Sequence, residues 1–442
     1  MNTSTRTSVT TAALSAGVLL LAALGGCTRG SSGPVAGQDT GDCSTLTVIT
    51  NRTAEARGSF LDYAAEFESA HPGVAVKFEA PPDYEGGMRT RMNTEDYGDV
   101  LNIPHSVPVD QFPNFFAPLG ATEDLSSKYY FVEQSSFRGK AYGLSQTASP
   151  GGYLVNLRVW RQAGVTTPPR TPEEFLTDLH AIADRTGSTP LYTNYKDGWP
   201  LQMWEQFNGL ADGPDSLNRL IAHPEPWAEG SDHYIADSIL YAAVADGLTE
   251  DDPATTDWNS SQTLLATGEV GTLMMPQFAM PLIQAAAREV GASPADIGYW
   301  PLPVVDGAGE YQSQLRGEYN LAINKNSPCQ KTARAWVDFF IDDSGYAASQ
   351  GSMSIVRDAP LPHNLQKFND LGIKYVELNP EPGDTVGALS AVQQEADLDF
   401  INDPAWRQEL IDIARGAAPG DKRSYFVELN RRWAEAVKTV AQ

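Results

Sequence analysis

The sequence is poor in positive charge, and this shortage narrows the range of partners. Its 31 lysine and arginine residues are outnumbered by 56 aspartate and glutamate residues, which gives a formal net charge of −25. A surface of this sign repels phosphate backbones. Nucleic acid is therefore not an expected partner.

Motifs for metal binding and catalysis are missing as well. The six histidines show no His-x-x-x-His spacing, and the acidic stretch from Glu250 to Asp257 lacks the alternating oxygen ligands and central glycine of an EF-hand loop. No Gly-x-Ser-x-Gly elbow, phosphate-binding glycine loop or Cys-His arrangement is found. We expect no metal, no cofactor and no enzymatic activity. A chain with this many carboxylates nevertheless offers pairs at glycosidase spacing, so a glycoside hydrolase stays open as an alternative.

The only long apolar run lies at the N-terminus. Arg6 precedes an apolar stretch from Thr11 to Gly26 of about 16 residues, shorter than the roughly 20 needed for a membrane-spanning helix. We expect residues 1–26 to be a signal peptide. Leu24-Gly25-Gly26-Cys27 resembles the lipobox of bacterial lipoproteins, which implies acylation of Cys27 with a lipid such as palmitate. The alternative is an ordinary signal peptide cut near Gly26.

Residues 27–43 are rich in Gly, Ser, Thr and Pro and are expected to form a flexible lipidated tether. This predicts attachment through Cys27 to the extracellular face of the cell membrane. The other two cysteines are Cys43 and Cys329. In an oxidising exterior they can pair, which would stabilise the fold by about 4–5 kcal/mol in the chain-entropy model, or they can remain separate thiols.

About 400 residues follow the tether. Because a single hydrophobic core rarely extends over so long a chain, two lobes are expected. The first region alternates strand and helix, which predicts a parallel sheet with crossovers. The expected elements are strands 46–50, 74–78 and 99–103 with helices 59–70 and 88–93. Ligands bind at the carboxyl ends of such strands, where this sequence places Arg52, Asp83, Tyr84 and His105.

A second αβ region follows. Thr171 is a capping residue, with Pro172 at the first helical position and a Glu at the third, so a helix is expected to begin there. Further strands are expected at 153–156, 190–193, 270–275 and 317–324, and helices at 331–341, 405–415 and 425–440.

Several stretches resemble the extracellular solute-binding proteins of ABC-type carbohydrate importers, the class that includes the maltose-binding proteins. They are Ala65-Glu66-Phe67-Glu68-Ser69-Ala70-His71-Pro72-Gly73, Tyr97-Gly98-Asp99-Val100, Val155-Asn156-Leu157 with Ala163-Gly164-Val165, Thr171-Pro172-Glu173-Glu174-Phe175, Gly268-Glu269-Val270-Gly271-Thr272-Leu273-Met274 and Tyr319-Asn320-Leu321-Ala322-Ile323-Asn324-Lys325-Asn326-Ser327. Each is weak alone, and their order and spacing carry the resemblance.

The resemblance implies an α/β fold of the two-lobe periplasmic-binding-protein type (class II). Each lobe would be a sheet flanked by helices, and a hinge would let the lobes close on ligand. The expected division is 44–147 and 303–345 for the N-lobe, and 148–302 and 346–442 for the C-lobe, the last segment mostly helical. The implied partners are a small sugar and the permease subunits of an importer, with the protein itself a monomer.

Sugar pockets pair stacking aromatics with planar polar groups. The loop from Tyr192 to Trp204 is dense in both, and Asn194, Tyr195 and Trp199 are expected in the site, whereas Tyr192 and Trp204 also suit a core. Phe278 stands where some relatives place a sugar-stacking Trp. Trp300 is expected either to line the cleft or to plug the hinge. Glu318 and Tyr319 precede a strand expected at the cleft floor, where Glu318 either accepts sugar hydroxyls or is a solvated loop charge.

The sequence therefore predicts a lipid-anchored protein that captures a mono- or oligosaccharide and delivers it to an importer. Two alternatives remain: a secreted carbohydrate-active hydrolase, and a lipoprotein that presents ligand to a sensor.

Overall fold

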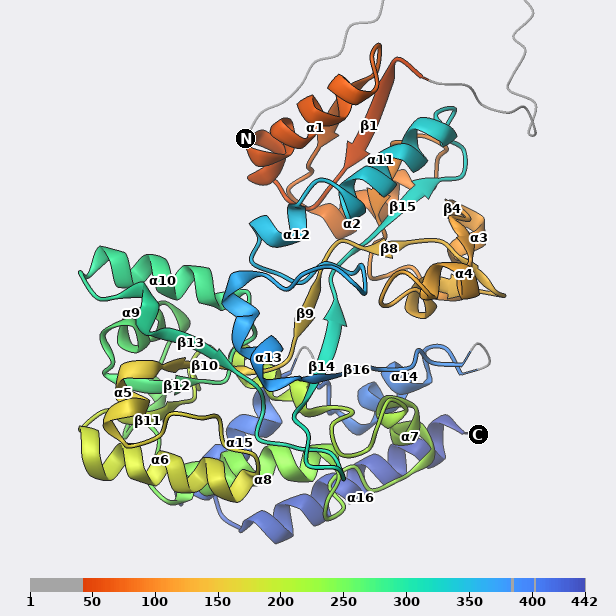
Figure 1. The fold of residues 1–442 in the computed structure, drawn as a ribbon. Coiled ribbons are helices and arrows are strands. Elements are labelled where there is room, and N and C mark those ends of the chain that lie inside the picture. Colours follow the sequence, from red (N-terminus) through yellow and green to blue (C-terminus); the bar gives the residue numbers. More distant parts are fainter. Residues whose placement is uncertain (1–42, 383–384, 401–402, 442) are drawn as a thin grey trace, which may run out of the picture. The chain divides into compact units, whose positions relative to one another are not determined.

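The computed structural model describes residues 43–382, 385–400 and 403–441, whose arrangement Figure 1 shows. The expected signal peptide, the proposed lipidation site Cys27 and nearly all of the tether lie outside the described residues. Within the described ranges, every helix is too short or too polar to span a membrane.

The first lobe is built on a six-stranded sheet that is parallel at its start. Strand β1 lies between β2 and β3 in parallel register, and β15 continues the sheet antiparallel to β3. The path runs β2-β1-β3-β15-β4, with β8 also paired to β15. The strands are β1 Thr45–Ile49, β2 Ala75–Glu79, β3 Val100–Asn102, β4 Phe116–Ala117, β8 Leu144–Ser145 and β15 Asn320–Asn324.

Alternation along these strands decides which helices cover which face. Val48 packs in one cluster with Phe60 of α1 (Ser59–Ala70) and Trp336 of α11 (Gln330–Asp342). The next residue, Ile49, packs in a different cluster with Met88 of α2 (Tyr84–Arg91). The sheet is therefore buried on both faces, as expected for parallel strands.

The second lobe has a four-stranded sheet in the order β11-β12-β10-β13. Its strands are β10 Tyr153–Asn156, β11 Thr189–Tyr192, β12 Val270–Leu273 and β13 Ile297–Trp300. The helices of this lobe are α5 Leu157–Gln162, α6 Pro172–Thr186, α7 Ser216–Ala222, α8 Asp232–Ala245, α9 Trp258–Thr267, α10 Ala279–Glu289, α14 Ala388–Ala396, α15 Ala405–Ala414 and α16 Lys422–Val440. The helix start predicted at Thr171 is confirmed, since its Oγ1 accepts the backbone N–H of Glu174 at 3.2 Å.

A three-stranded sheet, β16-β14-β9, joins the lobes and lies between them in Figure 1. Its strands are β9 Ala148–Pro150, β14 Gln312–Gly317 and β16 Lys374–Glu377. Before β14, Tyr311 contacts the second lobe, where its hydroxyl donates to the Pro168 carbonyl at 2.6 Å. Tyr346, which opens α12 (Tyr346–Ser349), packs on Phe60 and Phe340 of the first lobe.

The remaining elements are short. They are η1 Glu55–Arg57, η2 Val109–Gln111, α3 Phe112–Phe115, β5 Gly120–Ala121, α4 Thr122–Ser126, η3 Glu133–Ser135, β6 Ser136–Phe137, β7 Lys140–Ala141, η4 Trp199–Phe207, η5 Pro253–Thr255, η6 Pro294–Asp296, η7 His363–Leu365 and α13 Gln366–Leu371.

Cys43 and Cys329 form a disulfide, with their Cα atoms 5.4 Å apart. Cys329 immediately precedes α11 and Cys43 precedes β1, so the bridge ties the first strand to a helix that is 286 residues away in sequence.

Candidate ligand-binding site

Two predicted residues meet where β1 ends. Arg52 follows β1, Glu318 precedes β15, and their side chains form an ion pair. The Arg52 side chain is 33% exposed and that of Glu318 is 37% exposed. Both groups therefore remain within reach of solvent or a ligand.

Tyr319, next to Glu318, gathers three further side chains. Its hydroxyl donates to Glu85 Oε1 at 2.9 Å, and its ring lies 4.3 Å from that of His105 and 6.1 Å from that of Tyr84. Burial, followed by the nearby Glu85 carboxylate, raises the pKa of Tyr319 to about 12. Its hydroxyl is thus a proton donor at neutral pH.

The strand predicted at 317–324 is wrong as a single element, and the break explains this cluster. β14 ends at Gly317 and β15 begins at Asn320, so Glu318 and Tyr319 form the step between two sheets. β14 pairs with β9 and β16, whereas β15 pairs with β3, β4 and β8. Because β14 and β15 pair with different neighbours, the chain passes from one sheet to the other at Glu318 and Tyr319.

Sequence reasoning missed a chain of amides beneath the cluster. Gln146 Nε2 donates to Asn102 Oδ1 at 2.5 Å, and Asn102 Nδ2 donates to Asn51 Oδ1 at 2.7 Å. Tyr84, which is buried, donates to the Asn102 carbonyl at 2.5 Å. Asn51 and Asn102 both stand at strand ends. The rule that ligands gather at carboxyl ends already pointed to Asn51 beside Arg52, and the same rule could have found Asn102.

Asp83 has a local structural task. It is the N-cap of α2, and its Oδ1 accepts the backbone N–H of Gly86 at 3.0 Å. An aspartate at this position satisfies one of the free N–H groups of the first turn. Its carboxylate is thus committed to the helix that carries Tyr84 and Glu85.

The second lobe supplies the loop 193–199, called the binding loop below. Asn194 lies in the left-handed region with φ 57° and is only 1% exposed, and its side-chain Oδ1 is buried with no hydrogen-bond partner in the described part of the chain. Glu250 accepts bonds from both the backbone N–H and the hydroxyl of Thr193. The Thr193 contacts fix the start of the loop, and the buried Asn194 amide oxygen has no partner among the described residues.

At the other end of the binding loop, Trp199 meets Trp258 edge-on. The ring centroids are 5.7 Å apart, and the backbone N–H of Trp258 donates to Asp197 Oδ2 at 2.8 Å. Trp199 is half-buried. Phe278, which precedes α10, is 43% exposed and keeps an accessible aromatic face.

Two more predicted site residues contact other elements of the second lobe. The side chain of Tyr195 reaches α15, where its hydroxyl donates to Asp412 Oδ2 at 2.9 Å. Trp300 is 3% exposed and packs against Trp160 with the ring centroids 4.8 Å apart. It ends β13, the edge strand of the second sheet.

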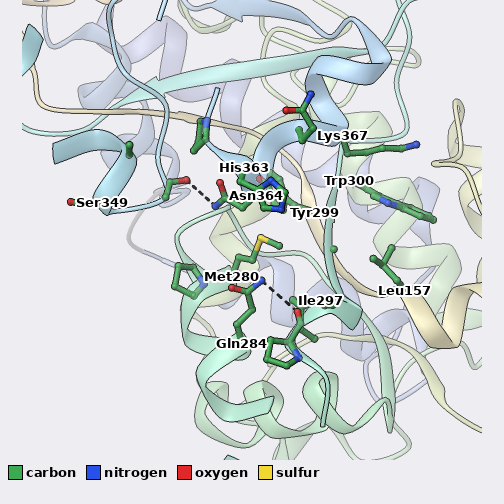
Figure 2. Close-up of a pocket in the computed structure, with 18 of the residues that line it drawn as sticks. Leu157, Met280, Gln284, Ile297, Tyr299, Trp300, Ser349, His363, Asn364 and Lys367 are labelled. Carbon is green, nitrogen blue, oxygen red and sulfur yellow. Dashed lines mark hydrogen bonds between the residues drawn. The ribbon is translucent and has the colours of Figure 1, made fainter. Parts of the chain in front are cut away.

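Trp300 also borders a groove of about 740 Å³, shown in Figure 2. Leu157 lies beside Trp300, with Met280 and Gln284 of α10 across the groove and His363, Asn364 and Lys367 above. Apart from Trp300, none of the predicted site residues lines this groove. The aromatic rings at its wall, Tyr299 and Trp300, are both buried, which leaves little ring surface for stacking.

Apart from Asp83, Tyr195 and Trp300, the predicted residues fall into two groups, one on each lobe. The first comprises Arg52, Tyr84, His105, Glu318 and Tyr319, and the second comprises Asn194, Trp199 and Phe278. Across residues 43–382, 385–400 and 403–441, no hydrogen bond, ion pair or ring contact joins them. Over the same ranges no cluster of three or more His, Cys, Asp or Glu side chains is arranged to hold a metal ion.

Comparison with known proteins agrees with this architecture. The family model for bacterial extracellular solute-binding protein matches residues 52–347. The diacetylchitobiose binding protein of Streptomyces coelicolor is 25% identical over 448 aligned positions, which cover 95% of this chain and 97% of that protein.

Solved structures of binding proteins share this fold. A binding protein of an ABC transporter from Bifidobacterium animalis subsp. lactis, in complex with mannobiose, superposes with a TM-score of 0.73 at 28% identity, covering 89% of this chain and 95% of that one. A manno-oligosaccharide specific solute binding protein from the same organism, in complex with mannotriose, gives 0.73 at 27% identity with the same coverage. The chain therefore belongs to the bacterial extracellular solute-binding proteins and has their two-lobe α/β fold.

Proposed function

We propose that this protein captures a short oligosaccharide between its lobes and delivers it to an ABC-type importer. The observation that carries the proposal is similarity over nearly the whole chain to proteins whose names record sugar ligands: diacetylchitobiose in one case, and mannobiose and mannotriose in two others.

The two residue groups suit such a ligand. Sugars present hydroxyl edges and apolar C–H faces, which require planar polar groups beside flat rings. On one lobe Arg52, Glu318 and Tyr319 would bind hydroxyls, and on the other Asn194 would accept one while Trp199 and Phe278 stack. Closure would bring the groups together, and contacts made only in the closed state would supply its free energy.

Calorimetric titration tests the substrate class. The panel contains mannobiose, mannotriose, diacetylchitobiose and raffinose, with a free amino acid and a dipeptide as non-sugar ligands. We expect at least one sugar to bind. Binding of none at millimolar concentration, together with tight binding of a non-sugar ligand, would refute the proposal.

Trp199→Ala tests the placement of the site. Loss of ring stacking is expected to weaken sugar binding by about 1–3 kcal/mol. Val427→Ala is the matched control, because Val427 of α16 is 62% exposed and belongs to neither residue group. An unchanged dissociation constant in Trp199→Ala would remove this residue from the site.

Binding without chemical change is part of the proposal. Bound sugar recovered after long incubation is expected to be intact by mass spectrometry. Release of shorter products, abolished by a single carboxylate substitution, would favour a hydrolase instead. Binding of a sensor domain rather than permease subunits in a pulldown would favour ligand presentation.

Membrane attachment through Cys27 and a monomeric state are proposed as well. The full-length protein is expected to incorporate radiolabelled palmitate and to enter the detergent phase, and Cys27→Ala is expected to do neither. Light scattering of the released protein should give the mass of one chain.

A further inference from the structure

Helix α15 contacts the binding loop at several successive positions. Pro404, which precedes the helix, lies so close to Gly198 that a Cβ at that glycine would come within 2.7 Å of the proline Cγ. Gly198 also has φ 72°, a left-handed conformation that favours glycine. The backbone of the loop at Gly198 therefore packs directly against the start of α15 and leaves no room for a side chain.

One turn further along, Gln408 donates from Nε2 to the carbonyl of Tyr195 at 2.6 Å. A turn beyond that, Asp412 accepts the hydroxyl of Tyr195 at 2.9 Å. The positions 404, 408 and 412 are four residues apart, so they lie on one face of the helix. This face lies against residues 195–198.

Arg407 extends the contact to η4, which continues directly from the binding loop. Its Nη1 donates to the Leu201 carbonyl at 2.9 Å, and its Nη2 donates to Glu205 Oε1 at 2.7 Å. Its Nε donates to Asp237 of α8 at 2.9 Å. The guanidinium is 1% exposed and thus ties three elements together inside the core.

We propose that α15 holds the binding loop in its ligand-ready conformation, with Arg407 and Gln408 as positioning residues that never touch the sugar. This inference rests on the proposed function, because it assigns a purpose to the same loop. Residues 193–198 have no helix or strand of their own, so their conformation depends on such anchors. A loop that is ordered before binding spares the ligand the entropy of ordering it.

The test variant is Gln408→Glu, which is nearly isosteric and removes the N–H donor to Tyr195. Hydrogen–deuterium exchange is measured first without ligand. We expect amide exchange in residues 194–198 to accelerate about fivefold or more, which corresponds to loss of one hydrogen bond. Exchange in α6 should not change.

The second measurement is the dissociation constant, by calorimetry, of the sugar in the panel that binds most tightly. We expect the dissociation constant to rise about fivefold in Gln408→Glu. Glu409→Gln is the matched control, since Glu409 lies on the same helix and contacts Tyr425 of α16 instead of the loop. Both the exchange and the dissociation constant should stay at wild-type values in this control.

The outcomes separate the two proposals. If the wild-type protein binds no sugar, the proposed function falls, and the exchange data still decide whether α15 orders the loop. Unchanged exchange in Gln408→Glu overturns the inference. Faster exchange with an unchanged dissociation constant overturns it as well, because binding would not depend on the ordered loop.

Discussion

Replacing Arg407 by methionine is expected to remove a large share of the stability of the second lobe. The guanidinium lies between Glu205, whose side chain is 2% exposed, and Asp237, whose side chain is 0% exposed. In Arg407→Met, Asp237 keeps the indole N–H of Trp227 at 2.7 Å. Glu205 keeps Asn208 at 2.8 Å and His233 at 3.3 Å.

The magnitude follows from that arrangement. Two buried carboxylates would lose their shared guanidinium, and breaking a buried ion pair from one side costs about 3–5 kcal/mol. The loss should depend on pH. Burial alone would raise the pKa of Glu205, but His233 and Arg407 lower it to about 2. A carboxyl with a lowered pKa contributes stability above its unfolded value, and this contribution is lost as pH falls through the folded value. Without Arg407 the pKa of Glu205 rises, so the protein can protonate it and the difference from wild type should shrink between pH 7 and pH 4.

Urea unfolding followed by circular dichroism at both pH values measures the effect. Arg431→Met is the matched control, because Arg431 of α16 also binds two carboxylates, Glu428 and Glu435, while its side chain is 53% exposed. Exposed pairs of this kind contribute at most about 1 kcal/mol. If Arg407→Met costs less than about 1 kcal/mol at pH 7, or no more than the control, the argument from burial is refuted.

Two further predictions concern stability. The double variant Cys43→Ser/Cys329→Ser removes a cross-link over a separation of 286 residues, which should lower the free energy of unfolding by about 5 kcal/mol. If the urea midpoint of the wild-type protein is the same with and without reductant, this prediction is contradicted. Glu250→Gln should reduce the pH dependence of the free energy of unfolding. Burial raises the pKa of Glu250 from 4.5 to about 7, so the folded state holds a proton that the unfolded state has released. Wild-type stability should therefore fall between about pH 4.5 and pH 7, by at most about 1.4 kcal/mol per pH unit from this group, and the variant should lack that fall in thermal unfolding. A wild-type curve that rises over the same range and matches the variant would contradict the assignment.

The local signals in the sequence were sufficient for the elements that position the site. The helix at Ser59–Ala70 is confirmed to the residue, because Phe60, Ala64 and Phe67 repeat at helical spacing and form its buried face. Strand ends also led to Arg52, Tyr84 and His105, since parallel strands point their carboxyl ends to one edge. Hydrophobic periodicity and the rule on strand ends each involve residues within about one helix or strand, so both can be recognised in a single sequence.

Only the tertiary structure decided which residues face one another. Tyr195 and Trp199 occupy one polar-aromatic stretch, yet the hydroxyl of Tyr195 is bonded to Asp412 of α15, whereas Trp199 lies half-buried beside Trp258. Glu205, Asp237 and Arg407 form one buried ion network although up to about 200 residues separate them in sequence. The sequence determined which face of each element is apolar and where each lobe carries polar groups. Which element covers that face depends on contacts between distant segments, and such contacts leave no periodic trace in the sequence.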